Sequence, residues 1–262
     1  MPKTVIIKLG GSAITVKDRP LTPRVKVIDN IAIELMEFKD EWRIILIHGA
    51  GSFGHPQAKK YGLNEGYRGA WQLRGVTETK TAVERLNLII LERFLEKGIY
   101  AFPIHPSSIA MNAAGKLIYI NEEMIKRVMN LGLVPLLHGD VVMDRKYGFS
   151  ILSGDTIARY LAIQLRADLL IFGMDVDGVY DRDPKLFPNA KLIKELHTRD
   201  LMKLKLSRNV RADVTGGIKR KLNEAIQAAR SGIKVVLLNI TVPGNLSTAL
   251  KGKLPERCTL LL

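Results

Sequence analysis

Residues 44–55 read Ile-Ile-Leu-Ile-His-Gly-Ala-Gly-Ser-Phe-Gly-His, a short apolar run that passes directly into a glycine-rich segment. An apolar run of this length, rich in β-branched residues, is typical of a strand that is buried on both faces, as in a parallel sheet. Glycines after such a strand let an anionic ligand approach the backbone N–H groups closely. We therefore expect a strand in Ile44–Ile47 and a phosphate-binding loop in His48–His55.

The same alternation of short apolar runs and longer segments of helical period continues along the chain. It predicts a βαβ series and a mostly parallel sheet, with a seam between two lobes near residue 170. The expected strands are Thr4–Ile7, Ile44–Ile47, Ala101–Ile104, Val134–Leu137, Leu169–Phe172 and Val235–Leu238. The expected helices are about Pro23–Phe38, Leu73–Leu95, Glu122–Asn130, Gly154–Leu165 and Gly217–Ser231.

The composition indicates a folded, basic protein. The 262 residues include 40 Lys and Arg against 26 Asp and Glu, a formal net charge of +14, and an ordinary apolar fraction of 47%. The single cysteine, Cys258, excludes an internal disulfide framework and fits a reducing compartment, so we expect a cytoplasmic protein without an export signal or a membrane span. The basic residues are dispersed and no polybasic tail or aromatic RNA-binding motif accompanies them, so nucleic acid is not the expected partner.

Two further glycine loops adjoin expected elements of this α/β pattern. Lys8–Ser12 ends the first strand, and Thr215–Ile218 opens the last long helix, with Lys219 and Lys221 in its first turns. A lone Gly-Gly pair is usually only a turn. Three such loops in one chain, each beside a lysine or a histidine, predict a polyphosphate site.

Other nucleotide and metal motifs fit less well. Gly49–Gly54 matches the dinucleotide pattern G-x-G-x-x-G, but Tyr61–Gly69 downstream is a loop, without the second strand and acidic residue that the pattern needs. The P-loop pattern is absent from the sequence. Asp175–Pro184 places four carboxylates after a strand but lacks the glycine position and closing Glu of a calcium loop. It is either a carboxylate-rich turn or a loop that holds the ribose or base of a nucleotide.

Five elements occur together, in an order that spans nearly the whole chain. They are Lys8–Ser12, His48–His55, Ser153–Asp155, Asp175–Tyr180 and Thr215–Gly217 with Lys221. The set resembles the amino acid kinase superfamily, and more closely its isopentenyl phosphate kinase branch. Gly-Ser-Phe-Gly-His ending at His55, with Lys17 nine residues after Lys8, is similar to that branch and to fosfomycin kinase, although Ala50 stands where a third glycine is common.

The resemblance implies a three-layer αβα sandwich around a mostly parallel sheet, formed by one domain, residues 1–262. The N-terminal lobe, about 1–170, would bind the phosphate acceptor, and the C-terminal lobe, about 171–262, would bind ATP. The implied reaction is ATP-dependent phosphorylation of isopentenyl phosphate to isopentenyl diphosphate, in isoprenoid biosynthesis of the mevalonate type. Mg²⁺ would be held chiefly by the oxygens of ATP, with no metal ligand from the protein. We also expect a homodimer with no nucleic-acid or membrane partner.

The resemblance also implies roles for individual residues. The catalytic set is Lys8, Lys17, His55, Asp155 and Lys221. The ATP-binding set is Lys8, Gly10, Gly11, Ser12, Gly51, Asp175, Gly178, Tyr180, Gly216, Gly217 and Lys221. The acceptor set is Ala50, Gly54, His55 and Gly154. To it we add an apolar stripe that is either a slot for the hydrocarbon tail or ordinary core, namely Val76, Val83, Leu86 and Ile90.

In this interpretation the three lysines surround the transferring phosphoryl group, and Asp155 holds them in place. Phosphoryl transfer needs positioning and charge stabilisation more than covalent help. No general base is needed, because a phosphomonoester with a second pKa near 6 is already largely ionised at neutral pH. His55 would donate a hydrogen bond to the acceptor phosphate, with Gly54 allowing its approach, and a dianion at that point would raise the pKa of the imidazole.

A lysine-rich, carboxylate-poor set fits a phosphate or phosphonate acceptor better than a hydroxyl acceptor. The alternative function is therefore a fosfomycin kinase or another small-phosphonate kinase. Uridylate kinase and acetylglutamate kinase are further away, because His55 is not part of their patterns. From another class, a non-catalytic nucleotide-sensing or nucleic-acid-binding protein remains open.

Overall fold

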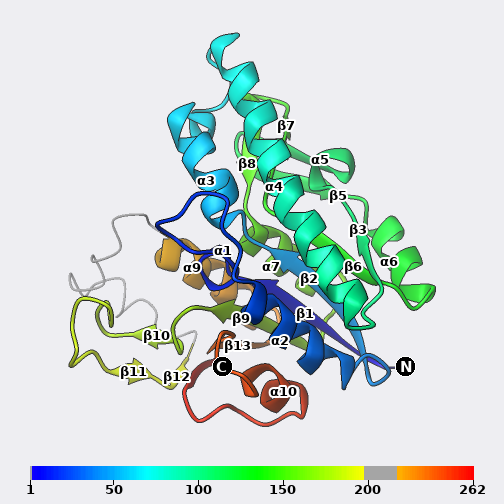
Figure 1. Cartoon of the computed structure of the whole chain (residues 1–262), viewed down its shortest axis with the longest axis vertical. Helices are drawn as coiled ribbons and strands as arrows, with labels where there is room; N and C mark the ends of the chain where they lie inside the picture. Colours follow the sequence, from blue (N-terminus) through cyan, green and yellow to red (C-terminus); the bar gives the residue numbers. More distant parts are fainter. Residues whose placement is uncertain (1, 198–216) are drawn as a thin grey trace.

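The computed structural model describes residues 2–197 and 217–262. Within them the chain forms an eight-stranded sheet in the order β12-β14-β13-β9-β1-β2-β6-β3 (Figure 1). β14 runs antiparallel to β13, and the other neighbouring pairs are parallel. The strands are β1 (Lys3–Leu9), β2 (Trp42–His48), β3 (Ala101–Pro103), β6 (Val134–His138), β9 (Leu169–Met174), β12 (Glu195–Leu196), β13 (Lys234–Asn239) and β14 (Cys258–Leu261).

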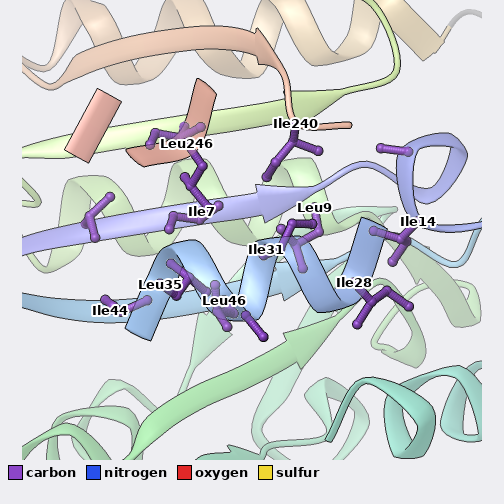
Figure 2. Close-up of a cluster of buried hydrophobic side chains, with 14 of the residues drawn as sticks. Ile7, Leu9, Ile14, Ile28, Ile31, Leu35, Ile44, Leu46, Ile240 and Leu246 are labelled. Atoms are coloured by element: carbon purple, nitrogen blue, oxygen red, sulfur yellow. The ribbon is translucent and has the colours of Figure 1, made fainter. Parts of the chain in front are cut away.

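Helices cover both faces of this sheet, which confirms the αβα sandwich. One face carries α2 (Val25–Met36), α4 (Trp71–Glu96) and α10 (Asn245–Leu250), and the other carries α6 (Glu122–Asn130), α7 (Gly154–Gln164) and α9 (Gly217–Arg230). Alternate residues of β1 enter the two cores, Ile7 with α2 and Ile6 with α7. Figure 2 shows the first core, where Ile7 and Leu9 lie beside Ile31 and Leu35 of α2.

The expected strands and helices are all present, within a few residues of their predicted bounds. The prediction for His48–His55 was wrong in part, because helix α3 (Gly51–Lys60) begins inside the segment that we expected to be a loop. Gly51 has a φ of +51°, and a Cβ there would lie 2.3 Å from Thr15 Oγ1. A side chain fits neither the backbone conformation nor the space, so glycine is required where the strand passes into the helix.

A second sheet, which the sequence analysis did not predict, has the strand order β5-β4-β7-β8. Its strands are β4 (Ala110–Ala113), β5 (Lys116–Ile120), β7 (Asp140–Asp144) and β8 (Gly148–Leu152). The buried carboxylate of Asp144 ties both hairpins together, because it accepts hydrogen bonds from the backbone N–H groups of Gly115 and Tyr147 and from Ser150 Oγ. Burial favours the protonated form of Asp144, but these hydrogen bonds outweigh burial and hold its pKa below the usual value.

The remaining elements are short connections around the two sheets. They are α1 (Gly11–Ile14), the 3₁₀ turn η1 (Leu63–Glu65), α5 (Pro106–Ile109), β10 (Val179–Tyr180) and β11 (Leu192–Ile193). β9 pairs with both β1 and β13, so the main sheet continues through the expected seam near residue 170. In the part of the chain that the structure describes, no helix combines the length and the apolar character that a membrane span requires.

Candidate active site

The glycine loops that follow β1 and β2 pack directly against each other at the carboxyl edge of the sheet. A Cβ on Gly11 would lie 2.5 Å from Gly51 N, and a Cβ on Gly49 would lie 2.8 Å from Gly11 N. Gly10 donates its N–H to Gly173 O at 2.8 Å, and a Cβ on Gly10 would lie 2.6 Å from that oxygen. The glycines are required because two loops and the end of β9 converge here with no space for side chains.

Three charged side chains from three different elements meet beside these loops. Lys8 Nζ, from β1, lies 2.9 Å from Oδ1 of Asp155 in the first turn of α7, and Lys221 Nζ, from α9, lies 2.8 Å from the same oxygen. The three side chains are 8%, 9% and 12% exposed in that order. Glu224 of α9 pairs with Arg159 Nε of α7 at 2.8 Å, a second ion pair between the two helices that carry Lys221 and Asp155.

This cluster keeps an excess of positive charge in a nearly dry place. Burial favours the protonated form of Asp155, but Lys8 and Lys221 outweigh burial and hold the pKa of the carboxyl far below its usual value. Burial, reinforced by Lys8 and opposed by Asp155, lowers the pKa of Lys221 to about 8. At neutral pH two ammonium groups therefore face one carboxylate. A cationic group fixed in advance at low dielectric is suited to stabilise the oxygens of a transferring phosphoryl group.

His55 lies on α3 close enough to this cluster to feel its charges. The residue is exposed to solvent, yet protein atoms around the ring lower its pKa, and the nearby charges of Lys8 and Arg220 lower it further against the opposite effect of Asp155. Among the described residues, the His55 ring has no hydrogen-bond partner. The imidazole is therefore available to a ligand.

The loop after β9 forms the other side of the site. Ser12 Oγ, from the first glycine loop, donates to Asp175 Oδ1 at 2.9 Å, and Lys185 Nζ pairs with the other oxygen of Asp175. Gly178 packs on β14, where a Cβ would lie 2.4 Å from Thr259 Oγ1. The hydroxyl of Tyr180 donates to Asp177 at 2.9 Å. The β1 and β9 loops are thus connected through a carboxylate.

Comparison with known proteins identifies the family of this chain. The family model described as the amino acid kinase family matches residues 3–239. The chain belongs to the amino acid kinase family. The isopentenyl phosphate kinase of Methanothermobacter thermautotrophicus is 35% identical over 257 residues, which cover 95% of this chain and 96% of that protein. That of Methanocaldococcus jannaschii is 38% identical over 229 residues, which cover 83% and 85%.

A solved structure gives the same result. The structure titled "X-ray structures of isopentenyl phosphate kinase" matches with a TM-score of 0.85 at 31% identity, over 99% of this chain and 100% of that one. The family resemblance inferred from the sequence is therefore confirmed, as is the fold. Membership of this family implies that the chain is a kinase that uses ATP.

Against this kinase framework, the predicted site residues fall into groups. Lys8, Asp155 and Lys221 meet directly, and His55 lies close to them. Lys17 lies on an exposed loop before α2, and among the described residues no partner for its ammonium is found. That loop contacts α3, since Leu21 N donates to Ser52 O at 3.3 Å. Gly217 begins α9, whereas Thr215 and Gly216 lie outside the described residues.

Two glycines of the predicted acceptor set have packing reasons of their own. A Cβ on Gly54 would lie 2.7 Å from Val83 Cγ2 and 2.8 Å from Ala50 Cβ, so Gly54 allows α3 to approach α4. A Cβ on Gly154 would lie 3.2 Å from His48 O, at the end of β2. Both positions lie where α3 and α7 begin, and a contact with the acceptor stays a prediction for them.

The apolar stripe on α4 divides between two environments. Leu86 and Ile90 are fully buried in the main core between α4 and the sheet, which favours ordinary core over a tail slot for these two residues. Val76 is half-buried and packs, together with Tyr61 and Ile151, on a separate small apolar cluster. Val83 lies beside Gly54 at the start of α3. Val83 is buried as well, so the half-buried Val76 is the member of the stripe that burial favours most for the tail, and a contact of either valine with the tail stays a prediction.

Sequence reasoning missed a polar group at the carboxyl ends of β6 and β3. Lys80 Nζ lies 3.0 Å from the buried Asp140 and 2.8 Å from Ser107 Oγ. His138 lies between His48 and His105, with ring centroids 5.3 Å and 5.5 Å away. The signal was available, because His138 and His105 directly follow predicted strands, as His48 does.

Proposed function

We propose that the chain transfers the terminal phosphoryl group of ATP to isopentenyl phosphate, forming isopentenyl diphosphate and ADP. The observation that carries this proposal is the buried Lys8–Asp155–Lys221 cluster with the exposed imidazole of His55 beside it, which has no hydrogen-bond partner within residues 2–197 and 217–262. In the reaction, an oxygen of the acceptor phosphate forms a bond to the γ-phosphorus, and the bond from that phosphorus to the bridging oxygen of ADP breaks. The attacking oxygen is already ionised at neutral pH, so no side chain has to remove a proton.

In this proposal the lysines stabilise the negative charge of the phosphoryl group during its transfer. Lys8 and Lys221 neutralise the oxygens of the transferring group, and Asp155 fixes both ammonium groups in advance, so that little reorganisation is needed during the reaction. Lys17 contributes a third cation from the exposed loop before α2. Support for this role comes from the contact between that loop and α3, on which His55 lies.

ATP is placed along the carboxyl edge of the sheet in this proposal. Its phosphates occupy the converging loops of Gly10, Gly11 and Gly51, where backbone N–H groups can approach the oxygens. The nucleoside part lies toward the C-terminal lobe, about residues 171–262. The candidate residues there, beside Ser12 in the first loop, are Asp175, Gly178, Tyr180, Gly216 and Gly217.

The acceptor is bound by the N-terminal lobe, about residues 1–170. Its phosphate lies against the starts of α3 and α7, near Ala50, Gly54 and Gly154, with His55 as the donor. Its short hydrocarbon tail extends toward Val76 and Val83. Support comes from the small apolar cluster that adjoins Val76, because burial of a tail against it is favourable by about 0.8 kcal/mol for each CH₂ group.

Mg²⁺ accompanies ATP in this proposal and is held by the phosphate oxygens, whose charge it reduces. In residues 2–197 and 217–262 no group of three His, Cys, Asp or Glu side chains is arranged to hold a metal ion. A magnesium ion that arrives with the nucleotide needs few protein ligands, because Mg²⁺ keeps several waters and binds substrate phosphates.

The kinase is proposed to work as a cytoplasmic homodimer. The edge strand β3 offers unpaired backbone groups, and Tyr100 and Phe102 beside them are 61% and 37% exposed. Leu88 and Leu95 of α4 are exposed as well. Light scattering after size exclusion tests the dimer, and a monomer at micromolar concentration would contradict it.

A panel of acceptors tests the function. ADP release is followed with isopentenyl phosphate, fosfomycin, UMP and acetylglutamate, and Asp155→Asn serves as the control for contaminating kinases. We expect isopentenyl phosphate to give the highest kcat/KM, and mass spectrometry to identify isopentenyl diphosphate. A preference for fosfomycin would show that the acceptor is a phosphonate instead of isopentenyl phosphate, while the proposed phosphoryl transfer from ATP would stand. ATP consumption with none of the four would contradict the proposal.

A further inference from the structure

Arg257 reaches the carboxyl edge of the sheet although it lies far from every predicted site residue in the sequence. It directly precedes β14, which runs antiparallel to β13 with Cys258 opposite Leu238. The beginning of β14 therefore lies beside the end of β13. This places Arg257 at the edge where the loops after β1 and β9 meet.

The carboxylate of Asp177 and the hydroxyl of Tyr180 together hold the Arg257 guanidinium by one edge. Asp177, in the loop after β9, accepts from Arg257 Nε at 2.6 Å, from Tyr180 Oη at 2.9 Å and from Asn239 Nδ2 at 3.2 Å. Arg257 Nη2 also donates to Tyr180 Oη at 3.2 Å. Two contacts along one edge set the plane of the guanidinium, although they go to two neighbouring side chains and not to both oxygens of one carboxylate.

The same contacts leave the flat faces of Arg257 accessible. Its side chain is 60% exposed, whereas that of Asp177 is 21% exposed. The polar atoms of Asp175 and Tyr180, the two side chains of this loop that we assigned to ATP, are already hydrogen-bonded within the protein. Arg257 is thus the polar side chain of this network that is most open to a ligand. A guanidinium of fixed plane is suited to stack on a planar aromatic ring.

The distance from the phosphate loops matches a nucleotide. β14 lies three strands from β1 in the order β14-β13-β9-β1, about 14 Å at the usual strand spacing. An extended nucleoside triphosphate has a comparable span between its terminal phosphate and its base. We propose that Arg257, held by Asp177 and Tyr180, stacks on the base of the phosphoryl donor and positions the nucleotide. The inference rests on ATP as the donor, not on the identity of the acceptor.

Calorimetric titrations of ADP and of inorganic tripolyphosphate test this role. Arg257→Ala should raise the Kd for ADP about tenfold and leave that for tripolyphosphate unchanged. Arg257→Lys should lose nearly as much affinity for ADP, because an ammonium keeps the charge but has no planar face. Asp177→Asn keeps Arg257 but weakens the contact that holds the edge of its guanidinium, so it should raise the Kd for ADP by a smaller factor.

Arg127 provides the matched control, because its Nε also pairs with a carboxylate, that of Glu123 at 2.9 Å, and its side chain is 77% exposed. It lies on α6, which packs on β6, five strands from β14. Arg127→Ala should bind ADP as the wild type does. Wild-type ADP affinity in Arg257→Ala or Arg257→Lys would overturn the proposal, and so would an equal loss for tripolyphosphate, which would indicate a phosphate contact. These titrations need no acceptor, so they decide the role of Arg257 even if isopentenyl phosphate is not phosphorylated.

Discussion

Replacement of Asp155 by Asn removes the one negative charge that two buried lysines share. Lys8 Nζ and Lys221 Nζ bond to the same oxygen, so they are at most about 5.7 Å apart, the sum of 2.9 Å and 2.8 Å. Two unit charges at that separation repel by roughly 3 kcal/mol at an effective dielectric constant of about 20. The wild-type pKa of Lys221 already includes this repulsion, so what Asp155→Asn removes is the attraction of the carboxylate, which offsets it. Because Lys221 Nζ lies only 2.8 Å from Asp155 Oδ1, that attraction is at least as large as the repulsion, and its loss corresponds to about two pH units or more.

The expected result is an earlier loss of activity as the pH rises. In the wild type the pKa of Lys221 is about 8, so kcat/KM should fall above about pH 8 as this ammonium loses its proton. In Asp155→Asn the same fall should begin at about pH 6 or below, and kcat at neutral pH should be lower by roughly 10²–10³. The measurement is kcat/KM for the acceptor between about pH 5.5 and 9.5, because this parameter reports groups of the free enzyme.

Asp140→Asn is the matched control, since Asp140 is also buried and also pairs with a lysine, Lys80. Its substitution should leave the alkaline side of the profile at the wild-type position. If Asp155→Asn lowers activity equally at every pH, then Asp155 does not act by keeping the two lysines charged, and the electrostatic reasoning is refuted.

Four further substitutions test other parts of the site and the fold. Lys17→Ala should lower kcat by roughly 10²–10³ with little change in the Kd for ATP, and wild-type turnover would remove Lys17 from the catalytic set. Val76→Ala should admit longer prenyl phosphates in a chain-length assay, whereas Leu86→Ala should leave that profile unchanged and lower the free energy of unfolding by about 2–5 kcal/mol in denaturant titrations. His55→Ala should lose most of its activity and His55→Gln less, because the Gln amide can still donate a hydrogen bond. If His55→Ala weakens the binding of ATP as much as the binding of the acceptor, His55 belongs to the nucleotide site instead. Asp144→Asn should lower the melting temperature at neutral pH. The difference should shrink below about pH 4, because the carboxyl of the unfolded chain then takes up a proton and the stabilisation that comes from the depressed pKa of the folded state is progressively lost. A difference in melting temperature that does not depend on pH would contradict this.

The main sheet was predictable because its strands are buried on both faces. Runs such as Ile44–Ile47 contribute to both cores, so every position is apolar and the pattern is unambiguous. The small sheet has a weaker pattern. In β7, Val142 is buried and Met143 next to it is 52% exposed, and β5 contains exposed Ile118 and Tyr119. With apolar residues on both the buried and the open face, these strands show no clean alternation that would predict them.

The stripe on α4 shows why a correctly predicted helix does not by itself identify a binding site. Val76, Val83, Leu86 and Ile90 lie near one face, as their spacing predicts, but α4 has 26 residues and is about 39 Å long. Its first turns pack on α3 and the small apolar cluster, and its last turns pack on the main sheet. Periodicity identifies a buried face but not the partner that buries it. The difference between a wall of a ligand slot and a wall of the core therefore needed the structure.

His55 connects the sequence prediction with the observed electrostatics. We expected a raised pKa beside a phosphate dianion, whereas the protein's own groups lower it through burial and the charges of Lys8 and Arg220. The two effects have one origin, because the cations that disfavour an imidazolium are the same cations that attract a phosphate. A dianion placed among them would offset their charge and favour protonation of His55. The ring can donate a hydrogen bond as a neutral imidazole and a stronger one as a cation. His55 can therefore bind the acceptor phosphate in either protonation state.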